Sequence, residues 1–262
     1  MSVELLSISA SALLVAVVAG WLWQIRSKNA GIADVIWAYG VGAASVFYAA
    51  QGPGIILYRA TVGVIAGVWF ARLGTHILLR LIREKHEDGR YRAIRERYGK
   101  RINVFHFFFF LAQAIAAWLF ALPMWIISHN ATPLTSIQFT LLLIAPIVVL
   151  IAFAGEWIAD RQLEQFRANP ANDGKTCRAG LWRYSRHPNY FFEWLHWFVY
   201  PLLAFGASYG TYIWLAPLLM FFFLYFFTGI PYTERQALRS RGEDYRSYQR
   251  TTSAFIPWRP KT

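Results

Sequence analysis

Long apolar runs separated by short polar connections make up most of this sequence. A transmembrane helix needs about 20 consecutive, mostly apolar residues to cross the hydrocarbon core of a bilayer. Seven runs approach or exceed that length: 4–23, 31–50, 54–79, 105–128, 133–157, 189–208 and 211–230. The pattern therefore predicts an all-α integral membrane protein, built as a single bundle of about seven transmembrane helices and one transmembrane domain over residues 1–262.

The lysines and arginines fall in alternate connections between these runs. The linkers 51–53 and 129–132 contain none, whereas the segments 83–101, 159–188 and 233–262 are rich in them. Because cytoplasmic loops of membrane proteins carry the excess of Lys and Arg, we expect the N-terminus outside and the C-terminus inside the cell. The net charge of +12 then follows from topology and from contact with anionic membrane lipids, and no nucleic-acid partner is expected.

Composition and cysteine content narrow the class further. With 56% hydrophobic and only 15% charged residues, the chain lies outside the usual range of soluble proteins. A single cysteine, Cys177, excludes an internal disulfide and a cysteine metal cluster. Glu193 and His196 form an E-x-x-H pair without a second copy, and the chain has no H-E-x-x-H motif, so we expect no metal site.

Several local patterns predict elements beyond the membrane. The run 133–157 continues without a helix breaker into EWIADRQLEQFR, so this helix should extend to Phe166 or Arg167. The segment 83–101 mixes acids, arginines and tyrosines, which favours a short amphipathic helix at the lipid headgroups. A polar helix is expected between Pro231 and Gly242.

Ionisable side chains within the apolar runs are the first functional candidates, because a charge at bilayer depth is costly unless it faces a partner or a cavity. They are Arg59, Arg72, His76, Glu156, Glu193 and His196. Glu193 and His196 share one helix face because they are three residues apart.

Two motifs near the C-terminus resemble the steroid 5-alpha-reductase family, in particular its bacterial, functionally undefined branch. They are GLWRYSRHPNYFFEW at 180–194 and DYRSYQRTTSAFIPW at 244–258, and the resemblance is clearest over about 150–262. It implies a seven-helix enzyme of the bacterial inner membrane, with its active site near the cytoplasmic face. Such an enzyme uses NADPH to reduce an activated C=C bond in a hydrophobic enone of the steroid, sterol, polyprenyl or fatty type.

The resemblance also implies where NADPH binds. The family's cofactor residues correspond to Asp160, Arg167, Lys175, Asn189, Glu193 and Tyr248, with Arg80 or Arg83 at the end of the third run. The residues themselves add three candidates. Arg186 and Arg250 are suited to phosphate because guanidinium groups form paired hydrogen bonds with it, and Tyr184 offers a ring face for stacking.

Hydride transfer to the beta carbon of an enone needs a donor that stabilises the enolate oxygen and supplies a proton. The family places a Gln-Glu pair at the end of its second helix and a tyrosine on its third. Here Gln51 is present, but Gly52 and Trp69 replace the other two residues. The catalytic residues we predict are Gln51, Tyr58, Arg72 and Glu193, with Tyr48 as a further possible donor.

Two other interpretations stay open. The R-H-P-x-Y element from Arg186 to Tyr190, with a glutamate near the end of the last run, is similar to membrane methyltransferases of the isoprenylcysteine carboxyl methyltransferase type. Those enzymes bind S-adenosylmethionine. A non-enzymatic lipid-binding protein would bind neither nucleotide.

Overall fold

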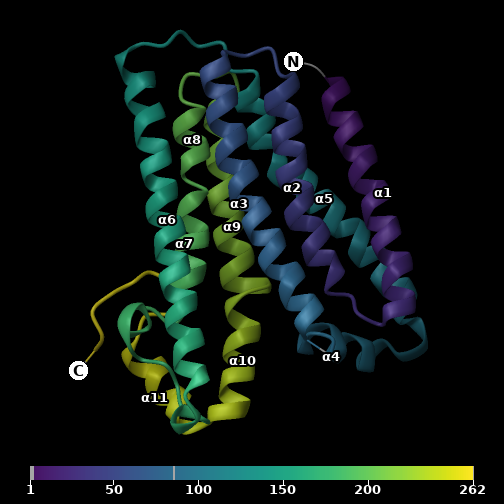
Figure 1. Cartoon of the computed structure of the whole chain (residues 1–262), viewed down its shortest axis with the longest axis vertical. Coiled ribbons are helices and arrows are strands. Elements are labelled where there is room, and N and C mark those ends of the chain that lie inside the picture. Colours follow the sequence, from purple (N-terminus) through teal and green to yellow (C-terminus); the bar gives the residue numbers. More distant parts are fainter. Residues whose placement is uncertain (1–2, 85, 262) are drawn as a thin grey trace. The chain divides into compact units, whose positions relative to one another are not determined.

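The protein is described by a computed structural model covering residues 3–84 and 86–261, and within these residues it is helical and contains no strand (Figure 1). Six stretches are long and apolar enough to cross a membrane: Val3–Ser27, Ile32–Gln51, Ile56–Arg83, Gly89–Ser128, Ser136–Ala168 and Gly210–Arg241. They fit a multi-pass integral membrane protein, as the hydrophobic pattern predicts.

The sixth predicted run, 189–208, differs from the prediction. It forms two short helices, α7 (Pro188–His196) and α8 (Val199–Leu203), instead of one of spanning length. Pro201 gives the physical reason, because proline has no N–H to donate to the carbonyl of Trp197 one helical turn earlier. The helix is therefore interrupted between His196 and Val199, and six helices of spanning length are found in the part that the structure describes.

The chain divides into two compact units. The N-terminal unit comprises Met1–Gln138 and Leu203–Gly210, and the C-terminal unit comprises Phe139–Leu202 and Thr211–Thr262. Single turns of 3-10 helix occur between the longer elements, at Gly99–Arg101, Pro170–Asn172, Gly180–Arg183 and Gly210–Trp214.

Four long helices form the N-terminal unit: α1 (Val3–Ser27), α2 (Ile32–Gln51), α3 (Ile56–Arg83) and α5 (Ile102–Ser128). Helices α2 and α3 approach closely at two glycines. A Cβ atom on Gly63 would lie 2.7 Å from that of Ala49, and one on Gly67 would lie 3.0 Å from Val46. Small residues of this kind let two membrane helices pack backbone to backbone.

The amphipathic helix expected within 83–101 is α4 (Gly89–Tyr98), and α2 holds it in place. Asp88 caps its first turn by accepting a hydrogen bond of 2.8 Å from the backbone N–H of Arg90. Asp34 on α2 then receives the Arg90 guanidinium at 3.0 Å and the Tyr91 hydroxyl at 2.8 Å. We call Asp34, Asp88, Arg90 and Tyr91 the Asp34 cluster.

The C-terminal unit contains most of α6 (Ser136–Ala168), then α7, α9 (Leu215–Phe222), a π-helical turn (Phe223–Phe227), α10 (Ile230–Arg241) and α11 (Glu243–Thr251). The extension of α6 past residue 166 and the polar helix α10 confirm the sequence predictions. Gly155 of α6 packs directly against the ring of Phe192 on α7, and a Cβ atom at this position would lie 2.3 Å from that ring. The Trp194 indole N–H donates to the carbonyl of Pro217 at 2.8 Å and joins α7 to α9.

Candidate functional site

A line of polar side chains follows one face of α7 and continues into α8. Asn189, Glu193, His196 and Tyr200 are spaced by four, three and four residues, which is the repeat of one helix face. Asn189 is half-buried and Glu193 is 9% exposed, whereas His196 and Tyr200 are completely buried. We call these four residues the polar stripe, and its burial increases along the chain.

Direct contacts join Asn189 to α6 and link Glu193, His196 and Tyr200 to one another. The Asn189 amide donates to the carboxylate of Asp160 on α6 at 3.0 Å. The Nδ1 atom of His196 lies 2.7 Å from the backbone carbonyl of Glu193, and because a carbonyl only accepts, Nδ1 carries the proton. The same atom is 3.7 Å from the Glu193 carboxylate, and the His196 ring contacts the Tyr200 ring at 5.7 Å. The structure thus brings together three of the predicted site residues: Asp160, Asn189 and Glu193.

Tyr200 ends this line inside the unit. Its side chain is buried against the rings of His196 and Trp197, and its hydroxyl has no hydrogen-bond partner among the described residues. Sequence analysis missed Tyr200 because it lies in an apolar run. Its spacing from Asn189 and Glu193 was the signal that could have identified it.

A second cluster surrounds Glu234 of α10. Its carboxylate accepts from the Arg186 Nε at 2.6 Å and from the Gln249 amide at 2.9 Å. The His187 Nε2 and the Tyr245 hydroxyl each lie 3.4 Å away. Burial lowers the pKa of His187, and Glu234 opposes that shift only in part, so the imidazole is neutral at neutral pH. We call these residues the Glu234 cluster.

Arg186 fastens the C-terminal segment to this cluster. Its Nη1 donates to the carbonyls of Gln249 and Thr252 at 3.1 and 2.6 Å, and its backbone N–H donates to Ser253 at 2.8 Å. Tyr248 adds to this joint, because its buried hydroxyl donates to the carbonyls of Trp182 and Ser185. Burial raises the pKa of Tyr248. The polar groups of Arg186 and Tyr248 thus bind the protein's own backbone.

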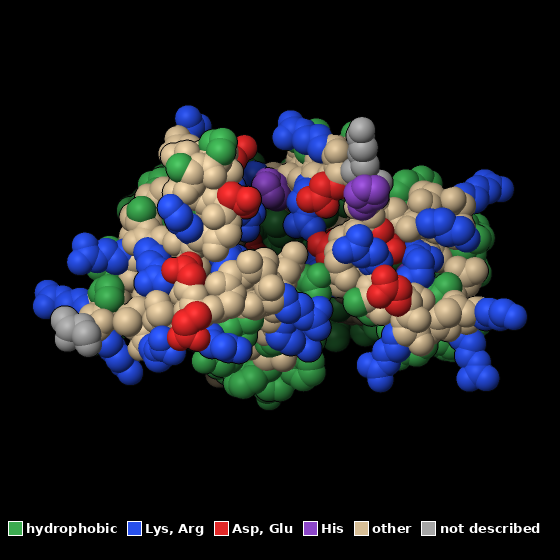
Figure 2. Space-filling view, turned by 90° about the horizontal axis from the view of Figure 1, so that it is seen from below, with side chains coloured by type: hydrophobic (Ala, Val, Ile, Leu, Met, Phe, Trp, Pro, Cys, Tyr) green, Lys and Arg blue, Asp and Glu red, His purple; other side chains and the backbone are tan. Residues whose placement is uncertain are grey.

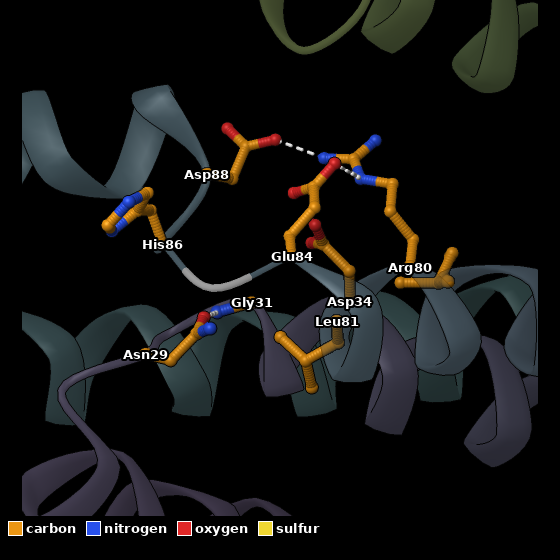
Figure 3. A pocket seen from close by; sticks show the side chains of 9 residues that line it. Asn29, Gly31, Asp34, Arg80, Leu81, Glu84, His86 and Asp88 are labelled. Atoms are coloured by element: carbon orange, nitrogen blue, oxygen red, sulfur yellow. Dashed lines mark hydrogen bonds and ion pairs between the residues drawn. The ribbon is translucent and has the colours of Figure 1, made fainter.

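The other predicted cations divide into two groups. Arg250 is paired with Glu243 at 2.8 Å, and Arg80 of α3 is paired with Glu84 at 3.3 Å and with Asp88. Figure 3 shows the Arg80 guanidinium pointing toward both acids at the edge of a small hollow in the N-terminal unit. Exposed cations lie elsewhere on α3 and the 175–183 loop, namely Arg83, Lys175 and Arg183.

The positive charges of two arginines act on the loop that contains Cys177. Burial raises the pKa of the Cys177 thiol, and the charges of Arg167 and Arg241 act on it in the opposite direction. The ends of α6 and α10 therefore both bring positive charge to this loop, beside the exposed Lys175.

Tyr184 is 42% exposed and lines an open groove with Pro257, Trp258 and Arg259. Figure 2 shows a face of the protein on which Lys and Arg side chains are prominent.

The remaining predicted catalytic residues belong to the N-terminal unit. Gln51 is exposed at the end of α2, and Tyr58 is buried on α3 with no partner for its hydroxyl among the described residues. Arg72 lies over the Trp69 ring at 4.9 Å. Tyr58 and Arg72 are fourteen residues apart on one helix, which is about 21 Å, so they cannot both contact one carbonyl group. The hydroxyl of Tyr48 is bonded to that of Ser9.

Comparisons with known proteins match this chain to a protein family. No curated protein and no solved structure matches this chain. The model of a family described as "Protein of unknown function (DUF1295)" matches residues 20–252, which is most of the sequence and includes the polar stripe and the Glu234 cluster. The chain therefore belongs to the DUF1295 family.

Proposed function

We propose that this protein is an NADPH-dependent membrane reductase that adds hydrogen across the activated C=C bond of a hydrophobic, steroid- or lipid-like enone. The observation that carries the proposal is the polar stripe, which leads from the half-buried Asn189 to the fully buried Tyr200 within an apolar helical unit. Such an arrangement suits a reaction between a charged cofactor and an apolar substrate, because the polar and apolar partners need different surroundings.

The topology belongs to the same proposal. We place the N-terminus outside and the C-terminus in the cytoplasm of a bacterial inner membrane, because the cations concentrate in alternate connections. In this arrangement α7 and α8 together form a seventh crossing, and the Glu234 cluster faces the cytoplasm, where NADPH is available.

The donor set near the 175–178 loop fits a phosphorylated dinucleotide. Arg167, Arg241 and Lys175 supply positive charge from three different segments, as phosphate groups require. Asp160 and Asn189 offer an acceptor and an amide for sugar or carboxamide groups, and Tyr184 offers an exposed ring. Arg186 and Tyr248 act indirectly, because they fasten the tail that frames this region. Arg250, which is paired with Glu243, and Arg80 of α3 would have to exchange their acidic partners for phosphate.

The chemistry divides between the cofactor and the chain. Bound NADPH supplies the hydride, and a proton completes the addition across the C=C bond. The chain's part is to hold the enone, exclude water and stabilise negative charge on the carbonyl oxygen. Glu193 has the carboxyl group nearest the buried end of the stripe. Its backbone carbonyl accepts from the His196 Nδ1 and would orient that ring.

Equilibrium dialysis of the detergent-purified protein against NADPH tests this proposal. We expect saturable binding that Arg167→Ala weakens about tenfold or more, because a charge-assisted phosphate contact is lost. Arg161→Ala is the matched control, since Arg161 is an exposed arginine on the same helix that lies over Trp157 at 5.3 Å. Absence of saturable NADPH binding to the unaltered protein would overturn the proposal.

One observation favours a second candidate function. Arg186, His187 and Glu234 belong to the motif shared with membrane methyltransferases, and they form one connected cluster. An S-adenosylmethionine-dependent methyltransferase is therefore the alternative, and dialysis against S-adenosylmethionine tests it directly. A protein that binds neither nucleotide would support the lipid-binding interpretation.

A further inference from the structure

The hydroxyl of Tyr200 is a buried donor without an acceptor. The side chain is 0% exposed, and no described residue accepts its hydrogen bond. Folded proteins satisfy nearly all of their buried polar groups, so an exception calls for a specific explanation. Other buried tyrosines of the same unit do have acceptors: Tyr245 reaches Glu234 and Tyr248 reaches two backbone carbonyls.

The surroundings of Tyr200 indicate what kind of acceptor is missing. Its ring contacts two aromatic rings, those of His196 at 5.7 Å and Trp197 at 5.3 Å, and Val199 beside it is also completely buried. The Nδ1 of His196 is already committed to the Glu193 carbonyl. A flat, mostly apolar molecule with one acceptor oxygen matches these neighbours better than a charged or strongly hydrated one.

We propose that the Tyr200 hydroxyl donates a hydrogen bond to the carbonyl oxygen of a hydrophobic ligand bound within the C-terminal unit. The hydrogen bond to a ligand carbonyl is inferred from Tyr200 itself. Only the identification of that ligand as the enone substrate rests on the proposed reductase function. In such a reaction the bond would strengthen as hydride addition places negative charge on the same oxygen. Tyr200 would then take the role for which sequence analysis considered Tyr48, Tyr58 and Arg72.

A pair of matched probes tests the inference without knowledge of the natural substrate. Cholest-4-en-3-one has the enone carbonyl, and cholest-4-ene is the same hydrocarbon without it. Binding of each is read from quenching of the intrinsic tryptophan fluorescence. We expect the unaltered protein to bind the ketone about tenfold more tightly, and we expect Tyr200→Phe to remove that preference while still binding the hydrocarbon.

Two further variants make the result specific. Tyr212→Phe carries the same substitution at a side chain that is 66% exposed in the same unit, and it should keep the full preference for the ketone. Tyr58→Phe changes a buried tyrosine of the N-terminal unit whose hydroxyl also has no partner among the described residues. If Tyr58→Phe and not Tyr200→Phe removes the preference, the inference is wrong. Equal binding of both probes to the unaltered protein, or no binding of the ketone, also overturns it.

If Tyr200→Phe does not fold, infrared spectroscopy of the ketone bound to the unaltered protein tests the same hydrogen bond. A hydrogen bond from a phenol lowers the carbonyl stretching frequency relative to an apolar solvent, and the unaltered protein suffices for this measurement. An unshifted carbonyl band contradicts the inference. NADPH dialysis on the same samples separates the two proposals, because a Tyr200-dependent ketone preference without NADPH binding sustains this inference and rejects the reductase.

Discussion

In each of the two units, a cluster around an acidic residue fixes a short polar helix. The two clusters differ in how deeply their charged side chains are buried. In the N-terminal unit, Asp34 receives Arg90 and Tyr91, and the Arg90 side chain is 31% exposed. In the C-terminal unit, Glu234 receives Arg186, whose side chain is only 11% exposed. A buried charge that loses its partner costs far more than an exposed one, because water cannot replace the missing contact. The Glu234 cluster should therefore contribute more to stability than the Asp34 cluster.

A further difference lies in what each cluster adjoins. The Asp34 cluster fastens α4 to α2, and Asp88 also pairs with Arg80 at the surface. His187 of the Glu234 cluster directly precedes α7, the helix that carries the polar stripe into the unit. The comparison indicates that an acidic cluster by itself is a structural device. A site is indicated only where polar groups also lead inward and end at an unsatisfied donor.

The largest effect is expected from Glu234→Gln. This change leaves Arg186 without its carboxylate partner and should lower the free energy of unfolding by about 3 kcal/mol. Denaturation in mixed micelles measures it, with Glu243→Gln as the control. Glu243 pairs with Arg250 and Arg246 at the exposed surface, so its loss should have almost no effect. Equal losses of unfolding free energy in the two variants would show that burial does not make the Glu234 ion pair more important than the exposed one.

Asp34→Asn should have an intermediate effect. It weakens two hydrogen bonds, from Arg90 and Tyr91, in a partly exposed setting, and we expect a loss of about 1–2 kcal/mol in the same assay. Proteolysis within 89–98 should become faster, because α4 loses its attachment to α2. A loss as large as that of Glu234→Gln would show that the two clusters are equivalent.

The smallest effect concerns pH and Asp244. Burial tends to raise the pKa of its carboxyl, but hydrogen bonds from Thr176 and the charge of Arg178 lower it below the ordinary value. Its stabilising contribution is therefore complete above the unfolded pKa of about 4 and is lost as pH falls through the lower folded value. The Thr176 amide donates to Asp244 at 2.8 Å, so its protection from hydrogen exchange, relative to the intrinsic rate at each pH, should fall in acid. Hydrogen exchange of Asp244→Asn should lack this pH dependence.

Sequence patterns predicted the helices well where apolar runs were uninterrupted. The extension of α6 and the polar helix α10 were predicted because no breaker interrupts the first and because Pro231 and Gly242 bound the second. The run 189–208 was interpreted as one helix because its apolar composition outweighed the single Pro201. The composition of a run shows how apolar it is. Whether the run forms one continuous helix can depend on a single proline, because proline lacks a backbone N–H.

The candidate site was predicted only in part. Asp160, Asn189 and Glu193 were named from the sequence and lie close together, but the contacts of Arg186 were not predicted. Its acceptors are backbone carbonyls more than sixty residues later, at Gln249 and Thr252. Contacts of this kind depend on how the tail packs, and no local pattern encodes them.

The attachment of Arg186 to the tail also bears on biosynthesis. The carbonyl groups that accept from Arg186 are translated some sixty residues after it. The loop around 175–187 therefore cannot form these hydrogen bonds until the ribosome has nearly completed the chain. Nascent protein that has already inserted most of its helices would still lack this joint. Assembly of the region around Glu234 should therefore be among the last steps of maturation, and translation stalled before residue 249 should yield an inserted but incompetent product.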